Sequence, residues 1–193
     1  MGKTEAAGPA AADADWRNYA GDELPPVLLA ALACFVEQGY HGTTIRQVAG
    51  RAGLSVPGIY HHYPSKHALL EGIAGRAMAD LLRRSRAALA EAGPGVEDRF
   101  RLLVQCLVLF HAHRSDQAFI AASEIRSLRE EARTVHLAAR SRQQALLAAV
   151  VEDDAGISST IPRLLVRLSV FVRAARRCRR RGQASSSERR ALW

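Results

Sequence analysis

The sequence feature that most constrains the fold is a dense series of helix start and stop signals between residues 39 and 65. Residues that end helices alternate there with residues that begin them, in the order Gly39, Thr44, Gly53, Ser55, Pro64 and Ser65. Thr44 and Gln47 have the spacing of a capping box, in which each side chain binds the other residue's backbone amide. Pro57 falls in the first turn after Ser55, where its missing N–H costs little. The pattern predicts two short helices joined by a tight turn, with longer helices before and after them.

Apolar residues on both sides of this segment recur at the spacing of an α-helix. Before it, one helical face carries Val27, Leu28, Ala31, Leu32, Phe35 and Val36. After it, periodic apolar residues predict helices from Ser65 to the break at Gly93, from Val96 onward, over 116–128 and over 130–152. Strong helix formers are abundant and runs of β-branched residues are scarce, so the predicted fold class is all-α.

The net charge of +8 comes mostly from the C-terminal end of the chain. Residues 163–193 contain ten arginines and one acid, a local charge of +9, which leaves −1 for residues 1–162. The overall charge is therefore no evidence that the rest of the chain binds nucleic acid. We interpret the basic end as a disordered tail. A shifted reading frame is the alternative, since sequence rich in Arg and Ser and poor in acids is typical of misread GC-rich DNA.

Three sequence features bear on location. The three cysteines (Cys34, Cys106 and Cys178) are far apart and odd in number, which favours reduced thiols. No apolar run approaches the roughly 18 residues of a membrane span. The N-terminus lacks the apolar core of a secretory signal. We expect a cytoplasmic protein that does not enter the membrane.

Two short helices joined by a glycine-containing turn are typical of a helix-turn-helix, whose second helix enters the major groove of DNA. The residues predicted to contact DNA from this helix and from the start of the next are Val56, Pro57, Gly58, Tyr60, His61, His62 and Lys66. The first three would face base edges, His61 a base or a phosphate, and the others phosphates. From residue 40 to residue 66 there are three cationic residues and no acid, which favours a polyanionic partner.

The segment FVEQGYHGTTIRQVAGRAGLSVPGIYHHYPSKHALL resembles the N-terminal DNA-binding domain of the TetR family of transcriptional regulators, over residues 26–75. The resemblance rests on Gly39-Tyr40, Thr43-Thr44, Gly53-Leu54-Ser55, Tyr60-x-His62-Tyr63 and Ser65-Lys66. It implies a homodimer of all-α subunits that binds an operator, with a C-terminal domain whose small-molecule effector lowers DNA affinity. It also adds Thr43, Thr44 and Arg46 to the predicted DNA contacts. The implied organisation is a flexible arm (1–22), a three-helix DNA-binding domain (23–68), a helical effector-binding and dimerisation domain (69–181) and a basic tail (182–193).

The segment FIAASEIRSLREEARTVHLAARSRQQALL resembles the C-terminal domain of actinobacterial members that repress lipid or steroid breakdown. That resemblance implies an apolar effector such as an acyl-CoA and a repressor on a palindromic operator. The residues predicted to line its pocket are Leu103, Cys106, Phe110, Phe119, Ile120, Glu124 and Arg126. Ordinary core packing of the apolar members is the alternative, because periodicity does not separate the two. We expect the dimer interface within 130–172.

Other classes of function find little support in the residues. His61 and His62 are adjacent, so their side chains should point apart on a helix, and no Cys or carboxylate has metal-ligand spacing to them. We therefore predict no metal and no cofactor. No nucleophile elbow, Walker loop or zinc-protease motif is present, which argues against an enzyme. The rival function is an all-helical protein-interaction module, and the acid-free segment argues against it.

Overall fold

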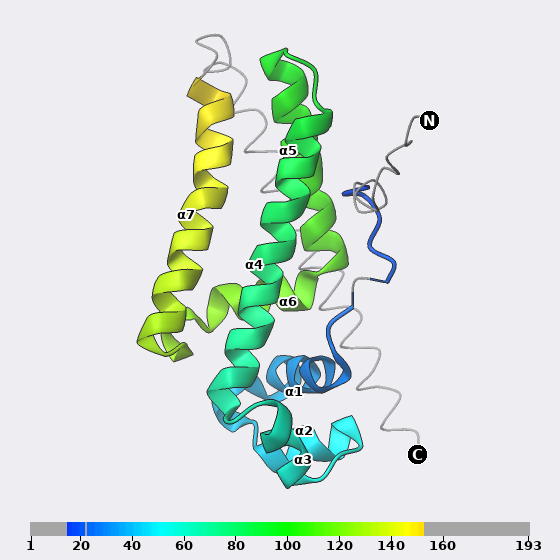
Figure 1. Ribbon diagram of the computed structural model, residues 1–193, viewed down its shortest axis with the longest axis vertical. Helices are drawn as coiled ribbons and strands as arrows, with labels where there is room; N and C mark the ends of the chain where they lie inside the picture. The colour runs from blue at the N-terminus through cyan, green and yellow to red at the C-terminus, as the bar shows by residue number, and fades with distance from the viewer. Residues whose placement is uncertain (1–14, 22, 153–193) are drawn as a thin grey trace, which may run out of the picture. The chain divides into compact units, whose positions relative to one another are not determined.

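The computed structural model of the chain describes residues 15–21 and 23–152 (Figure 1). The helices are α1 (Pro26–Gly42), α2 (Ile45–Ala52), α3 (Val56–His62), α4 (Lys66–Glu91), α5 (Val96–His113), α6 (Ser115–Ser123), the 3₁₀ helix η1 (Ile125–Ser127) and α7 (Glu130–Glu152). No strand occurs in the described residues, so the all-α prediction is confirmed. The described residues up to Ala149 belong to one compact unit.

The local signals between residues 39 and 65 act as predicted. Gly39 has a φ of +77° and interrupts the helical path of α1. Thr44 and Gln47 form the full capping box of α2, and Gly53 ends that helix with a φ of +68°. The Ser55 and Ser65 side chains accept hydrogen bonds from backbone amides and so begin α3 and α4. These turns gather α1, α2 and α3 at the N-terminal end of α4 (Figure 1).

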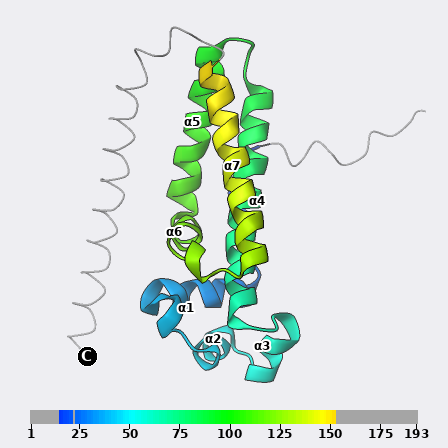
Figure 2. The same cartoon turned by 90° about the vertical axis from the view of Figure 1, so that its left-hand side faces the viewer.

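The core joins this three-helix group to the rest of the unit. Leu28 and Phe35 of α1, Ile59 of α3 and Ile73 of α4 are each at most 1% exposed and pack in one apolar cluster. Gly72 permits the close approach of α1 and α4, because a Cβ there would lie 3.3 Å from both Leu28 methyls. Beyond this cluster, α4, α5 and α7 run side by side, with α6 below α5 (Figure 2).

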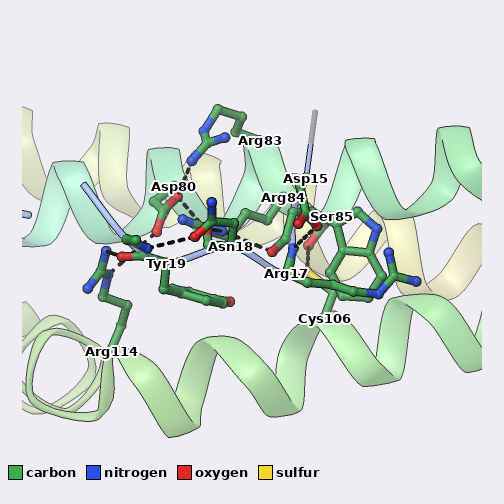
Figure 3. Close-up of polar contacts among 12 residues, drawn as sticks. Asp15, Arg17, Asn18, Tyr19, Asp80, Arg83, Arg84, Ser85, Cys106 and Arg114 are labelled. Atoms are coloured by element: carbon green, nitrogen blue, oxygen red, sulfur yellow. Dashed lines mark hydrogen bonds and ion pairs between the residues drawn. The ribbon is translucent and has the colours of Figure 1, made fainter. Parts of the chain in front are cut away.

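Residues 15–21, the described part of the flexible arm expected over residues 1–22, make specific contacts with the helices. Residues 15–19 lie between α4 and α5, and Trp16 is 1% exposed (Figure 3). The Trp16 indole donates to Glu91 (2.7 Å), and Arg17 forms a bidentate ion pair with the same carboxylate. These contacts hold the pKa of Glu91 down to about 2, the Arg17 hydrogen bond being the largest cause. The segment is therefore part of the packed structure.

Arg84 of α4 fixes this segment from the inside. Its guanidinium is 1% exposed and donates to the Trp16 carbonyl (2.9 Å), the Asn18 carbonyl (2.7 Å) and the Asp80 carboxylate (2.7 Å). Tyr19 lies under the same guanidinium at 3.8 Å, and its burial raises the pKa of the phenol to about 12. An arginine buried in this way needs these acceptors, because an unpaired buried charge is costly.

Several sequence predictions fall beyond residue 152. The apolar run over 161–172, the second half of the expected dimer interface, the basic tail over 182–193 and the frame-shift alternative lie outside the described residues. The expected domain boundary at 68/69 falls inside α4 and stays a prediction. Among the described residues, no helix combines the length and apolarity that crossing a membrane requires.

Candidate DNA-binding surface and ligand pocket

The second helix of the predicted helix-turn-helix, α3, is held by one buried residue and presents the others outward. Ile59 is fully buried and anchors the helix. The predicted DNA-contact residues that are exposed are Thr44, Arg46, Pro57, Tyr60, His61 and His62. Val56 and Gly58 are half-buried at the helix start. These side chains come from α3 and from the N-terminal end of α2, so the structure brings most of the predicted set onto neighbouring elements.

Gly58 has an internal role in addition to the predicted one. Its amide donates to the Ser55 hydroxyl (3.1 Å), and a Cβ on this residue would lie only 3.3 Å from that oxygen. Glycine therefore leaves room for the cap that begins α3. A larger residue here would disturb the cap as well as any approach to a groove floor.

Thr43 corrects one sequence prediction. It was expected at the DNA, but it is 1% exposed. Its hydroxyl lies 2.8 Å from the Gly39 carbonyl and 3.1 Å from the Cys34 carbonyl, and it donates to these groups at the end of α1. Thr43 thus fixes the joint between α1 and α2, because its hydroxyl binds carbonyls in the last turns of α1.

Lys66 also differs from its predicted role as a phosphate donor. Its ammonium donates to the backbone carbonyls of Tyr40 and Thr43, both at 2.9 Å, and lies 4.6 Å from the centre of the Tyr40 ring. The side chain ties the first turn of α4 to the joint between α1 and α2. Its ammonium also donates to the His41 carbonyl at 3.5 Å, so all three of its N–H groups have acceptors inside the protein.

The charge available on this surface is smaller than the sequence indicates. Arg51 forms a bidentate ion pair with Glu37 of α1, both contacts at 2.8 Å. With Lys66 bound to carbonyls, Arg46 remains, and within the described residues it has no acidic partner. Phosphate attraction must then come from Arg46, neutral donors and the helix N-termini.

The two adjacent histidines do not diverge as expected. The rings of His61 and His62 meet edge to face, with centres 5.3 Å apart. Within the described residues, no group of three His, Cys, Asp or Glu side chains is placed to hold a metal ion. Both rings are exposed and free to meet a partner.

A pocket of about 280 Å³ lies among α4, α5, α6 and α7. Its apolar wall consists of Ala77, Met78, Leu81, Leu107, Phe110, Ala118, Ala121 and Ala122. The facing helix α7 contributes mostly polar residues, namely His136, Arg140, Gln143, Gln144 and Leu147. Figure 2 shows α7 running alongside α4 and α5.

Of the seven predicted pocket residues, Phe110 lines this space. Leu103, Cys106 and Ile120 are at most 1% exposed and pack in the interior, which is the alternative that periodicity left open. Phe119 is 49% exposed, and Arg126 is exposed on η1. Glu124 accepts a hydrogen bond from Ser127 next to it. Sequence reasoning missed the contribution of α7, because polar residues facing a cavity look like an ordinary solvent face.

Two of the polar pocket residues have buried atoms without a hydrogen-bond partner. Within the part of the chain that the structure describes, Nδ1 of His136 and Oε1 of Gln143 are unpaired, although these residues are only 6% and 8% exposed. The other side of the Gln143 amide donates to the buried Ser85 hydroxyl (3.0 Å). Burial and, to a smaller extent, the nearby Arg140 lower the pKa of His136.

The connection between the pocket helices contacts the end of α1 and the first turns of α4, on either side of the helix-turn-helix. Ser127 of η1 lies 3.2 Å from Nε2 of His41, two residues before Thr43. Arg129, between η1 and α7, donates to both Glu71 oxygens on α4 at 2.7 and 2.6 Å, and this contact is the main cause of the lowered pKa of Glu71. The segment that joins two pocket walls is therefore attached to the elements that position α2 and α3.

An all-helical chain with a helix-turn-helix at one end and a helical pocket beyond it defines the class of DNA-binding regulators with a ligand-binding domain. The family described as "Bacterial regulatory proteins, tetR family" matches residues 27–73, and "Tetracyclin repressor-like, C-terminal domain" matches residues 93–171. The chain belongs to the TetR family of transcriptional regulators, as the sequence resemblance predicted, and this is not a family of enzymes.

Curated relatives are similar over part of their length. The transcriptional activator FasR of Mycolicibacterium smegmatis is 33% identical over 104 residues, which are 51% of this chain and 47% of that protein. The transcriptional repressor KstR2 of Mycobacterium tuberculosis is 28% identical over 116 residues, 59% of this chain and 56% of that protein. The chain thus spans about half the length of the curated relatives that it matches.

Solved structures share the fold. PfmR, a TetR family regulator from Thermus thermophilus, superposes with a TM-score of 0.62 at 26% identity, over 65% of this chain and 68% of that one. AibR, solved with isovaleryl coenzyme A and operator DNA, gives a TM-score of 0.59 at 24% identity. The superposition covers 67% of this chain and 70% of the AibR chain. At that identity the likeness to AibR concerns the fold.

Proposed function

We propose that this protein is a dimeric repressor that binds a palindromic operator and is released when an apolar effector such as an acyl-CoA enters the α4–α7 pocket. The main support for DNA binding is the surface formed by α2 and α3. From residue 40 to residue 66 it has no acid, and Thr44, Arg46, Pro57, Tyr60, His61 and His62 are exposed. Val56 and Gly58 lie at the start of the helix that would enter the major groove.

The rival function, a helical protein-interaction module, fits this surface less well. Its exposed residues are mostly polar, the side chains of Leu54 and Tyr60 are 39% and 49% exposed, and Ile59 of α3 is buried in the core. A docking surface for another protein would be centred on a larger cluster of aromatic or apolar anchors. Exposed hydroxyl, imidazole and guanidinium groups instead suit phosphates and base edges.

The contacts of η1 support regulation by the pocket. The effector would bind between α6 and α7, and η1 and Arg129 connect these helices to His41 and Glu71. A ligand that binds better to one arrangement of α6 and α7 would shift the population of α2–α3 arrangements through these contacts. We propose this route as the origin of the lowered DNA affinity.

The proposed dimer uses α7. Val135 and Leu137 are 70% and 45% exposed on this helix, and contact with a partner subunit would remove this apolar area from water. Repression follows from a compact dimer that covers its operator and blocks polymerase. Among the relatives, FasR is an activator and KstR2 is a repressor. Whether this protein represses or activates transcription therefore needs its own measurement.

Fluorescence anisotropy with DNA from upstream of the protein's own gene tests the proposal. We expect saturable binding that weakens with salt, with a log–log slope of about −0.9 for each phosphate neutralised. Octanoyl-CoA should lower the affinity, and free coenzyme A should not. Binding that is insensitive to salt would favour the interaction module, and a reporter gene behind the same DNA gives the sign of regulation.

A further inference from the structure

The pocket combines one apolar wall with one polar helix face. α4, α5 and α6 present apolar side chains apart from His111, whose Nδ1 is bonded to the Leu107 carbonyl of its own helix, whereas α7 presents His136, Arg140, Gln143 and Gln144. These four positions are separated by four, three and one residues, so they form one stripe along a single face of the helix. A pocket built for a plain hydrocarbon chain would need no such stripe.

The stripe contains buried polar atoms that have no partner inside the protein. Four buried side-chain atoms are unpaired in the described residues: the hydroxyls of Tyr19 and Tyr40, Nδ1 of His136 and Oε1 of Gln143. The two tyrosines do not line the pocket, and the other two residues do. Buried polar groups are nearly always hydrogen-bonded in folded proteins, so two unpaired atoms in one cavity point to a ligand that supplies the partners.

Both groups can adapt to a hydroxyl or an oxo group. A neutral imidazole has one donor and one acceptor nitrogen, and an amide has a carbonyl and an NH₂. The Gln143 amide is held on one side by Ser85 of α4, and so its other side has a fixed direction. Arg140 lies between the two, is exposed, and has no acidic partner in the described part of the chain.

The helix geometry gives the spacing of the groups that the ligand must carry. At about 1.5 Å of rise per residue, Arg140 lies about 4.5 Å from Gln143 and about 6 Å from His136 along the axis. An anionic head at Arg140 would therefore place atoms a few bonds along the attached chain beside one of the unpaired groups. The pocket volume of about 280 Å³ is at the low end for ligand sites and suits a chain of medium length.

We propose that the effector is a medium-chain acid, free or as a thioester, that carries a hydroxyl or oxo group near its head rather than a saturated chain. Its anionic or thioester head pairs with Arg140, its oxygenated carbon binds Gln143 or His136, and its remaining carbons lie on the apolar wall. This assignment rests on the proposed function, since it names the ligand class of the same pocket. A saturated chain would leave both buried atoms unpaired, so we expect octanoyl-CoA to bind and to act more weakly than its 3-hydroxy counterpart.

Calorimetric titration of the full chain tests this with two matched pairs of probes. These are octanoate against 3-hydroxyoctanoate, and octanoyl-CoA against 3-hydroxyoctanoyl-CoA. We expect the hydroxylated member of at least one pair to bind about tenfold more tightly or better. The Gln143→Leu variant should lose this preference, and Gln105→Leu, which alters an exposed glutamine of α5 outside the pocket, should keep it.

The outcomes separate this assignment from the proposed function. Equal affinities within both pairs, or no binding by any of the four probes, would overturn the assignment. The four probes are compared on the unaltered protein. The assignment can therefore be refuted even if the Gln143→Leu variant does not fold. A hydroxylated probe that binds preferentially without changing DNA affinity in the anisotropy assay would support the ligand class and refute the regulatory role.

Discussion

Replacement of Lys66 by methionine distinguishes a structural role of this lysine from a DNA contact. Methionine keeps the unbranched apolar stem and removes the ammonium that donates to Tyr40 and Thr43 at 2.9 Å. Hydrogen bonds to charged groups contribute about 1.5–3 kcal/mol each. Lys66 is half-buried, so water can partly replace the ammonium at these carbonyls. We therefore expect a loss of about 2 kcal/mol for the pair, which lowers Tm by roughly 4–8 °C in a chain of this size.

Thermal unfolding followed by circular dichroism measures the stability of Lys66→Met, and anisotropy at several salt concentrations measures its DNA binding. We expect Tm to fall while the log–log salt slope stays unchanged. Arg46→Met is the matched control, because Arg46 is exposed and has no acidic partner in the described residues. It should leave Tm nearly unchanged and reduce the slope by about 1.8 per dimer, about 0.9 for each phosphate contact. A Lys66→Met protein with normal Tm and a reduced slope would refute this reasoning and restore Lys66 as a phosphate contact.

Three further predictions follow from contacts elsewhere. Gly72→Ala should destabilise the protein by about 1–3 kcal/mol in urea unfolding because its Cβ meets a leucine of α1 at 3.3 Å, whereas Gly75→Ala, with nothing within 4 Å, should stabilise it by about 0.5–1 kcal/mol. Equal effects would contradict the packing argument. The pKa of Glu91 is lowered to about 2, so its contribution to stability is complete above about pH 4.5 and is lost as the pH falls toward 2. The fluorescence of Trp16 should report this loss, and Glu91→Gln should abolish the pH step. Ser127→Ala should leave DNA binding of the free protein intact and weaken the effect of octanoyl-CoA in anisotropy; an undiminished effect would exclude the contact with His41 from the coupling route.

The features that sequence predicted correctly are those decided by neighbouring residues. The capping box of Thr44 and Gln47, the end of α2 at Gly53 and the caps of α3 and α4 all depend on groups within four residues of one another. Such signals are readable because the chemistry that satisfies a helix end lies in the next turn. The start of α7 near residue 130 was predicted from the helical period of its own residues.

The features that sequence missed depend on residues far apart in the chain. Trp16 is in a polar N-terminal stretch, and its partners Arg84 and Glu91 follow 68 and 75 residues later. Arg84 itself lies in the run RRSR, which is typical of a solvent-exposed helix face, yet it is 1% exposed. No local pattern separates an arginine that faces water from one that binds two backbone carbonyls of another segment.

Buried polar groups of two kinds can be distinguished in this unit: those that are hydrogen-bonded within the fold, and those in the pocket that keep an unpaired atom. Arg84, Thr43 and Lys66 are all drawn inward, and each binds backbone carbonyls that would otherwise lack donors. Such groups are satisfied by the fold itself, and their loss should appear as lost stability. His136 and Gln143 are as buried as many core residues, but each keeps an unpaired atom in the described structure, and both line the same pocket. Replacement of His136 by an apolar residue should therefore cost little stability and instead change which ligand binds, whereas Gln143→Leu should also lose the buried hydrogen bond to Ser85.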